Sequence, residues 1–288
     1  MIVWAYDPEQ LGPLPAGVEL SDEPGPDVEF VIPRWEDLPD LEAMPSLRVV
    51  QVLSAGVDWI VDRVPTGVTL CSARGARDRA MAEWVVAAIL ADAKQARACA
   101  EQQALAQWRP VAMRDGSDLS VLILGHGSIG REVARLLEPF GCEVVGVGRR
   151  RRDDVRGMDE LPELLGDADV VVNLLPLTEA TRGAVGAAEL AGMREGALYV
   201  NGGRGATTDT GALVEALESG RVRAVLDVVD PEPLPSEHPL WRAPNVLITP
   251  HSAGDTPAAD RAAWELAAQQ LRRHVAGEPL RNVVAEGY

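Results

Sequence analysis

A glycine-rich turn between two apolar segments constrains the fold of this chain more than any other feature of its sequence. Residues 119–124 form a strand-like apolar run, Gly125-His-Gly-Ser-Ile-Gly130 follows at once, and a helical pattern starts at Ser128. The first glycine of such a turn permits a tight bend, the second lets backbone approach a pyrophosphate, and the third allows close helix–strand packing. Gly125, Gly127 and Gly130 therefore predict the dinucleotide-binding turn of a doubly wound parallel sheet.

Strand-like and helical segments alternate regularly after this turn, which predicts a Rossmann-type domain. Its expected strands are 119–124, 143–148, 169–175, 197–201, 223–228 and 246–249, with helices from 128, near 160 and from 209. Short apolar strands at 1–5, 28–32, 47–53 and 68–71 alternate with Pro/Gly turns and predict a small parallel, flavodoxin-like sheet. An alanine-rich helix over about 78–108 could bridge the two domains of this α/β chain. A last helix, about 257–275, leads to an apolar tail, 282–285, that could return to the first domain.

Charge and apolar content exclude several classes of partner. The 288 residues include 27 basic and 44 acidic ones, a net charge of −17, which argues against nucleic acid and anionic membrane as partners. We find no apolar run long enough to span a bilayer and no signal-peptide pattern. The three cysteines, Cys71, Cys99 and Cys142, lack C-x-x-C spacing and are expected to be buried thiols in a reducing cytoplasm. No metal site is predicted.

The end of the second strand of the Rossmann-type domain indicates which nicotinamide cofactor binds. An acid there would hydrogen-bond the ribose hydroxyls of NAD. The sequence instead reads Gly148 followed by four arginines, with Arg149 and Arg150 nearest the strand end. Guanidinium groups pair well with a phosphate dianion, so NADP is the predicted cofactor. The alternative is a solvated basic run.

An arginine, a glutamate and a histidine each stand in a Gly/Pro-rich turn after an apolar run. Arg204 lies in Asn201-Gly-Gly-Arg-Gly, Glu232 in Asp-Pro-Glu-Pro after 222–229, and His251 in Pro-His-Ser-Ala-Gly after 246–249. Such strand ends are where open α/β sheets bind ligands. Taken singly, they could be a structural ion pair, an exposed acid and a core histidine. Together they indicate an acid–base pair and a carboxylate anchor, because a carboxylate orients an imidazole and raises its pKa. With the dinucleotide turn, they point to hydride transfer on a carboxylate-bearing substrate.

A turn of small residues follows the apolar run 47–53. Its sequence is Ser54-Ala-Gly-Val-Asp58. Backbone N–H groups of Ala55, Gly56 and Val57 can bind a carboxylate there, although a plain strand-to-helix turn would read the same way.

With these motifs, the chain resembles the D-isomer-specific 2-hydroxyacid dehydrogenase family over nearly its whole length. Besides the motifs above, the matching pieces are Met81-Ala-Glu83, Leu175-Pro-Leu-Thr-Glu-Ala-Thr181, Asp227-Val-Val-Asp-Pro-Glu-Pro-Leu-Pro235 and His238-Pro-Leu-Trp241. Two departures stand out. Asn201-Gly-Gly-Arg has two glycines where a bulkier residue is common, and Thr207-Thr-Asp-Thr replaces the usual hydrophobic helix start.

The resemblance implies a discontinuous substrate domain, 1–93 with 264–288, and a cofactor domain, 94–263. It implies that Arg204 binds the substrate's carboxylate and keto oxygen, that His251 donates the proton, and that Glu232 orients it. Ala55, Gly56 and Val57 would bind the substrate. The implied cofactor-binding residues are Met81, Gly125, Gly127, Ser128, Ile129, Gly130, Arg149, Arg150, Leu175, Pro176, Thr181, Gly202, Gly203, Asp227, Ser252, Ala253 and Gly254, with Asp227 facing the nicotinamide amide.

The resemblance also implies a homodimer formed through the cofactor domains with the long alanine-rich helix. Small side chains let helices approach closely, whereas the alternative is a helix buried within its own chain. For function, the leading hypothesis is reduction of a small 2-keto acid, glyoxylate or hydroxypyruvate, with NADPH. The alternative is a non-catalytic nicotinamide-sensing protein or corepressor on the same fold.

Overall fold

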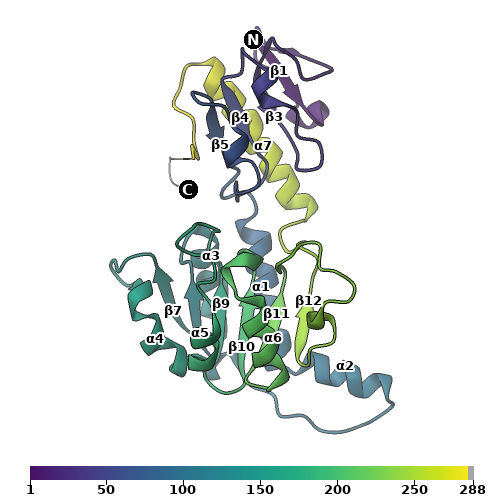
Figure 1. Ribbon diagram of the computed structural model, residues 1–288, viewed down its shortest axis with the longest axis vertical. Helices are drawn as coiled ribbons and strands as arrows, with labels where there is room; N and C mark the ends of the chain where they lie inside the picture. The colour runs from purple at the N-terminus through teal and green to yellow at the C-terminus, as the bar shows by residue number, and fades with distance from the viewer. Residues whose placement is uncertain (285–288) are drawn as a thin grey trace. The chain divides into compact units, whose positions relative to one another are not determined.

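Two compact α/β units make up the computed structural model of the protein, which describes residues 1–284. The first unit combines Met1–Asp78 with the C-terminal segment from Asp255, and the second is Arg79–Gly254 (Figure 1). The first unit is therefore built from both ends of the chain. Its limits differ from the predicted 1–93 with 264–288, because the helix that begins at Asp78 packs into the second unit and the helix that begins at Pro257 packs into the first.

The first unit contains a parallel sheet with strand order β2-β1-β3-β4-β5, the flavodoxin-like arrangement. The strands are β1 (Ile2–Ala5), β2 (Glu19–Leu20), β3 (Val28–Ile32), β4 (Val49–Gln51) and β5 (Thr69–Cys71). Helix α7 (Pro257–Val275) covers one face, where Trp264 and Leu271 pack with Val3 and Phe30. The tail returns as predicted: Val283 bridges Cys71 in the sheet. Ala285, at the end of the predicted tail, lies outside the described residues.

The second unit contains a parallel sheet of order β12-β11-β10-β9-β6-β7-β8, the doubly wound arrangement. Its strands are β6 (Ser120–Leu124), β7 (Glu143–Gly148), β8 (Arg156–Gly157), β9 (Val170–Asn173), β10 (Ala197–Asn201), β11 (Val222–Leu226) and β12 (Val246–Ile248). All strands are parallel, but the order in which they are added reverses at β6 and β9: β7 and β8 lie on one side of β6, and β9 to β12 lie on the other. Such a switch point is where doubly wound sheets bind ligands. The carboxyl ends of the strands align at one edge, with Asn173 opposite both Leu124 and Asn201.

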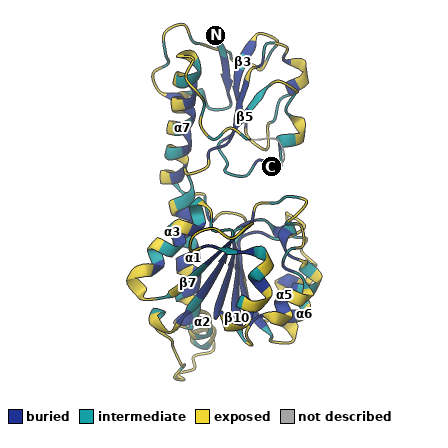
Figure 2. Cartoon of the chain, turned by 90° about the vertical axis from the view of Figure 1, so that its left-hand side faces the viewer, coloured by how far each residue is buried: buried dark blue, intermediate teal, exposed yellow. Residues whose placement is uncertain are grey.

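Helices cover both faces of this second sheet, which is buried throughout its centre (Figure 2). They are α1 (Asp78–Ala93), α2 (Ala96–Ala104), α3 (Ser128–Leu137), α4 (Leu161–Leu164), α5 (Ala187–Gly192) and α6 (Thr210–Glu218). On one face, Val85 and Ile89 of α1 pack with Val121 and Ile123 of β6. This packing places α1 in the second unit.

The alanine-rich segment does not form the single long helix expected over 78–108. The backbone of Gln95 adopts a left-handed conformation, φ 55°, which ends α1 and starts α2 in a new direction. The chain returns to the end of α1 at Arg114, whose N–H donates to Ala93 O at 2.9 Å. Residues 95–113 thus form an arm with both ends at one point. It carries the exposed side chains of Leu105, Trp108 and Met113.

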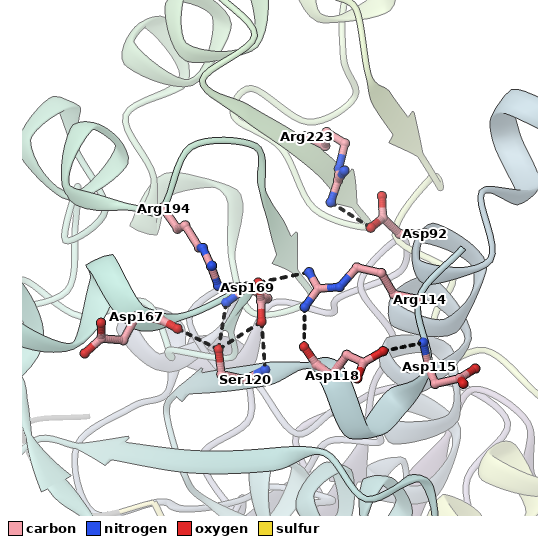
Figure 3. Close-up of polar contacts among 9 residues, drawn as sticks. All are labelled: Asp92, Arg114, Asp115, Asp118, Ser120, Asp167, Asp169, Arg194 and Arg223. Atoms are coloured by element: carbon pink, nitrogen blue, oxygen red, sulfur yellow. Dashed lines mark hydrogen bonds and ion pairs between the residues drawn. The ribbon is translucent and has the colours of Figure 1, made fainter. Parts of the chain in front are cut away.

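A buried carboxylate ties the returning end of the arm to the sheet at the amino ends of the strands. Asp169 is 8% exposed and accepts hydrogen bonds from Arg114 and Arg194 at 2.9 and 2.8 Å (Figure 3). Its other oxygen accepts from Ser120 N and Oγ, both at 3.1 Å. Burial alone would raise the pKa of Asp169, but the bonds from Arg114 and Ser120 outweigh it and hold the pKa at about 2.

Replacing Asp169 with asparagine is expected to destabilise the protein by about 2.5 kcal/mol at pH 7, the free energy that corresponds to the fall of its pKa from 3.8 to about 2. The depressed pKa means that the stabilisation is complete above about pH 4 and is lost as the pH falls toward 2. Urea unfolding at pH 7, 5 and 3.5 tests this. Asp167→Asn, at an exposed neighbour, is the control. Equal midpoints for wild type and Asp169→Asn at pH 7 would contradict the assignment.

The expectation of three buried thiols is wrong for Cys99. Cys71 is buried, and burial raises its pKa to about 11, but Cys142 is partly exposed and Cys99 is exposed on α2. The cause is the new direction of α2, where no side chain is buried. Separately, none of the helices within residues 1–284 is both long and apolar enough to cross a membrane.

Candidate active site

The segment after β10 follows a path that only glycine permits on both sides of Arg204. A Cβ on Gly203 would lie 2.7 Å from Leu175 O, and one on Gly205 would lie 1.9 Å from Val229 O. The backbone is therefore packed between the ends of β9 and β11. Arg204, half-buried, donates from Nη1 to Gly203 O at 2.9 Å. This close packing explains why glycine stands at position 203, one of the two positions where a bulkier side chain is common.

A buried polar network that the sequence did not predict lies beneath this segment. Thr207 Oγ1 donates to Arg204 O at 2.6 Å, and Asn173 Nδ2 donates to Thr207 Oγ1 at 2.9 Å. Asn201 Oδ1 accepts from Gly203 N at 3.1 Å, and its Nδ2 donates to Thr208 Oγ1 at 3.2 Å. The polar helix start is thus a support for the Arg204 turn. Both β9 and β10 end in an asparagine, and this repeated polar residue at the end of a buried strand is the sequence feature that could have indicated the network.

Asp227, at the end of β11, organises the loop that follows β12. Its side chain is 2% exposed and accepts hydrogen bonds from Thr249 Oγ1 at 2.5 Å, Ser252 N at 2.9 Å and Ala253 N at 3.1 Å. A carboxylate with three donors fixes the backbone on both sides of His251. Asp227 therefore has a structural role in this loop. Its predicted contact with the nicotinamide amide stays a prediction.

His251 is held in an uncommon backbone conformation next to Glu232. Its φ is 51°, in the left-handed region, and its N–H donates to Asp227 O at 2.8 Å. Such a residue costs roughly 1–3 kcal/mol and persists where surrounding contacts enforce it. Its Nδ1 lies 2.8 Å from Glu232 Oε2, and Glu232 Oε1 accepts from Val229 N at 2.9 Å. Glu232 is thereby oriented by backbone and orients the imidazole in turn.

The electrostatics of this pair favour a charged histidine. The hydrogen bond that His251 donates to Glu232 raises the pKa of His251; burial opposes this rise, and the negative charge of the glutamate adds to it. Burial would raise the pKa of Glu232, but His251 and the Val229 N–H lower it overall. With Nδ1 engaged by Glu232, Nε2 is the nitrogen left to give or take a proton.

The glycine-rich turn has the geometry that a dinucleotide needs. Gly125 has φ 90°, and a Cβ there would lie 2.6 Å from Leu174 O. A Cβ on Gly130 would lie 2.8 Å from Gly125 O, so α3 packs closely against the strand. Among residues 1–284, a Cβ on Gly127 would meet only Gly125 O, at 3.9 Å, and no side chain caps α3. The first-turn N–H groups of α3, which include Ser128 and Ile129, thus have no side-chain cap, as expected where a helix start receives a pyrophosphate.

Two other predicted cofactor residues, Met81 and Leu175, lie beside Gly202 and Gly203. A Cβ on Gly202 would lie 3.0 Å from Met81 Cε, and Gly203 abuts Leu175 as described. Thr181 Oγ1 donates to Pro176 O at 2.6 Å, which closes the loop after β9. Ser252, Ala253 and Gly254 continue the His251 loop.

The arginine run after β7 divides into two pairs. Arg151 pairs with Glu160 at 3.0 Å, and Arg152 donates to His126 O at 3.3 Å. Arg149 and Arg150 are exposed, and their guanidinium groups make no hydrogen bond or ion pair with residues 1–284. The two arginines nearest the strand end are therefore the ones available to a ligand.

The substrate-binding turn predicted after β4 lies in the first unit. Ser54 Oγ donates to Gly56 O at 2.7 Å and accepts from Trp59 Nε1 at 3.2 Å, while Val57 is buried. The role of Ala55, Gly56 and Val57 toward substrate stays a prediction. Nearby Arg77 forms ion pairs with Asp255 and Asp260 at 2.8 and 2.7 Å.

Comparison with known proteins identifies the family. The family "D-isomer specific 2-hydroxyacid dehydrogenase, NAD binding domain" matches residues 86–253. The glyoxylate reductase of Aeropyrum pernix is 34% identical over 262 residues, 85% of this chain and 78% of its own. This protein therefore belongs to the D-isomer specific 2-hydroxyacid dehydrogenase family.

Solved structures agree over the full chain. One is a D-isomer specific 2-hydroxyacid dehydrogenase from Xanthobacter autotrophicus Py2 in complex with NADPH and MES, at TM-score 0.88 and 32% identity, covering 100% of this chain and 99% of that one. An NADPH-dependent glyoxylate/hydroxypyruvate reductase from Sinorhizobium meliloti, in complex with NADP and sulfate, has TM-score 0.88, 30% identity and the same coverage. The two-domain fold with a Rossmann-type cofactor domain is thus confirmed.

Proposed function

We propose that this protein reduces a small 2-keto acid to the D-2-hydroxy acid with NADPH. The observation that carries the proposal is the contact between Glu232 and His251, 2.8 Å, on strand-end loops beside the Arg204 turn. When bound, the nicotinamide supplies the hydride to the carbonyl carbon. Negative charge then develops on the carbonyl oxygen, which protonated His251 can neutralise by donating from Nε2.

Arg204 has a complementary role in this proposal. Its guanidinium can hold a carboxylate with two parallel hydrogen bonds and can also donate to the oxygen where charge develops. The buried network of Asn173, Asn201 and Thr207 fixes the backbone from which the Arg204 side chain extends, and this favours a donor that is oriented before the reaction begins. Preorganised donors of this kind stabilise a transition state without reorganisation.

NADPH is preferred over NADH in this proposal because Gly148 removes the ribose-binding acid and leaves Arg149 and Arg150 at the strand end. Changing both arginines to alanine is expected to weaken NADPH binding about ten- to a hundredfold and to leave NADH nearly unchanged. Fluorescence titration of each cofactor measures this. Arg151→Ala is the matched control, because Arg151 pairs with Glu160.

Adding Gly148→Asp to the double variant should then invert the preference. A Cβ at position 148 would lie 3.2 Å from Val155 Cγ1, a contact that a shift of a few tenths of an ångström relieves. A wild-type enzyme that binds NADH as well as NADPH would contradict the proposed preference. So would a double variant that keeps its NADPH affinity.

A substrate panel tests the proposed activity. Glyoxylate and hydroxypyruvate are the preferred substrates, and the relatives named above support them. Oxidation of NADPH is followed by absorbance with glyoxylate, hydroxypyruvate, pyruvate and phenylpyruvate, and turnover should be fastest with one of the first two. No oxidation with any of the four would favour the non-catalytic nicotinamide-sensing protein.

Three unpaired cysteines support a reducing compartment such as the cytoplasm.

We propose a homodimer, supported by the arm rather than by α1. Val85 and Ile89 of α1 lie in the core of their own unit, whereas Trp108 and Leu105 on the arm are 99% and 67% exposed. Light scattering at micromolar concentration should give about twice the chain mass of 30.8 kDa. Trp108→Ser should weaken the dimer, while Trp35→Ser, at another exposed tryptophan, should not. A monomeric mass for the wild type would refute the dimer.

A further inference from the structure

His126 lies against the strand whose end is expected to select the cofactor. A Cβ on Gly146, inside β7, would lie 2.5 Å from His126 Cγ and 2.9 Å from its Nδ1. The imidazole therefore occupies the space that any side chain at position 146 would take. Residues two apart on a strand share a face. The ring thus lies on the same face of β7 as position 148.

Position 148 is where an acid would hold the ribose hydroxyls of NAD, and here it is glycine. The backbone of His126 is fixed beside it. Gly125 N and His126 N both donate to Val147 O, at 2.9 and 3.0 Å, and Arg152 donates to His126 O at 3.3 Å. The imidazole is therefore held where the adenosine ribose and its 2′ substituent are expected.

The ring's protonation follows from its surroundings. Its Nδ1 is buried and has no hydrogen-bond partner among the described residues. Burial, followed by the charge of Arg131, lowers the pKa of His126; Asp154 opposes them and Arg152 adds to them. The ring is thus neutral at pH 7. With no acceptor at the buried Nδ1, the proton belongs on Nε2, which becomes a hydrogen-bond donor.

We propose that His126 is a further specificity-determining residue, whose neutral imidazole donates a hydrogen bond from Nε2 to the 2′-phosphate of NADPH. The inference rests on the proposed use of NADPH. A phosphate dianion accepts such a bond more strongly than the hydroxyl that NADH presents at the same place. His126 would therefore add to the preference set by Arg149 and Arg150.

His126→Phe tests the inference, because phenylalanine keeps a flat ring against Gly146 and removes the donor. Calorimetric titrations without substrate compare adenosine 2′,5′-bisphosphate with AMP, and NADPH with NADH. We expect the two ligands with a 2′-phosphate to bind about tenfold more weakly, because a hydrogen bond to a charged group contributes at least this much to affinity. The affinities of AMP and NADH should change less than twofold. The difference should persist from pH 7 to 8.5, where the phosphate remains a dianion.

Gly146→Ala provides a second test, since the added Cβ displaces the imidazole without removing it, and it decides the matter if His126→Phe does not fold. Both folded variants should show the same selective loss. Equal weakening of all four ligands, or no weakening, overturns the role of His126. If the wild type nevertheless binds NADPH much more tightly than NADH, the proposed cofactor preference stands. Equal binding of NADPH and NADH by the wild type overturns both.

Discussion

Replacing His251 with glutamine is expected to lower kcat for 2-keto acid reduction by about three orders of magnitude, within the usual range for loss of a general acid. Glutamine keeps a polar side chain near Glu232 but cannot deliver a proton. The dissociation constant of NADPH should change less than threefold, because His251 lies on the loop after β12 and not on the glycine-rich turn. Steady-state kinetics with glyoxylate and a separate NADPH titration measure the two quantities.

Glu232→Gln is the matched variant for the same pair. The hydrogen bond that His251 donates to Glu232 raises the pKa of His251, so the reductive kcat/KM should be high below that pKa and fall as the pH rises through it. Removing the carboxylate should move this fall toward lower pH. Turnover of His251→Gln above a tenth of wild type, or an unchanged pH profile in Glu232→Gln, would remove His251 as the proton donor.

Arg204→Ala should lower kcat/KM by about three orders of magnitude, since it removes both a carboxylate anchor and a donor to the developing oxyanion. Arg204→Lys should recover part of the loss, because lysine keeps the charge but not the paired hydrogen bonds. NADPH affinity should be little changed in both variants. Equal activities of the lysine variant and wild type would show that paired hydrogen bonding by Arg204 is not needed.

Much of the fold follows from local sequence patterns. Short, mainly apolar runs predicted β3, β7 and β10 with the bounds that the structure has, because the strands of buried parallel sheets carry apolar residues along most of their length. Helix α7 also begins and ends as predicted, with Pro257 at its first position and Thr256 as its cap.

What could not be predicted depends on tertiary contacts. Alanine-rich sequence continues through Gln95, so nothing local indicates the left-handed residue that separates α1 from α2. The unit boundary likewise depends on which sheet the apolar face of α1 covers. The short strands β2 and β8, with two residues each, exist through pairing with a neighbour rather than through their own sequence.

The candidate site shows the same division. Glycine- and proline-rich turns after strands indicated Arg204, Glu232 and His251 as site residues. The structure brings Glu232 and His251 into contact. Their catalytic roles stay predictions. The hydrogen bonds of Asp227 to the His251 loop, and those of Asn173 beneath Arg204, arise between segments far apart in sequence. No local pattern specifies such contacts.

Hydride transfer from labelled cofactor tests the central claim most directly. Wild-type protein is incubated with hydroxypyruvate and NADPH carrying deuterium at C4 of the nicotinamide, in the transferable position. The product is analysed by mass spectrometry and chiral chromatography, with His251→Gln as the control. The account predicts D-glycerate with one deuterium at C2, and at most traces from the variant. Unlabelled product, L-glycerate, or no product from hydroxypyruvate and glyoxylate alike would contradict it.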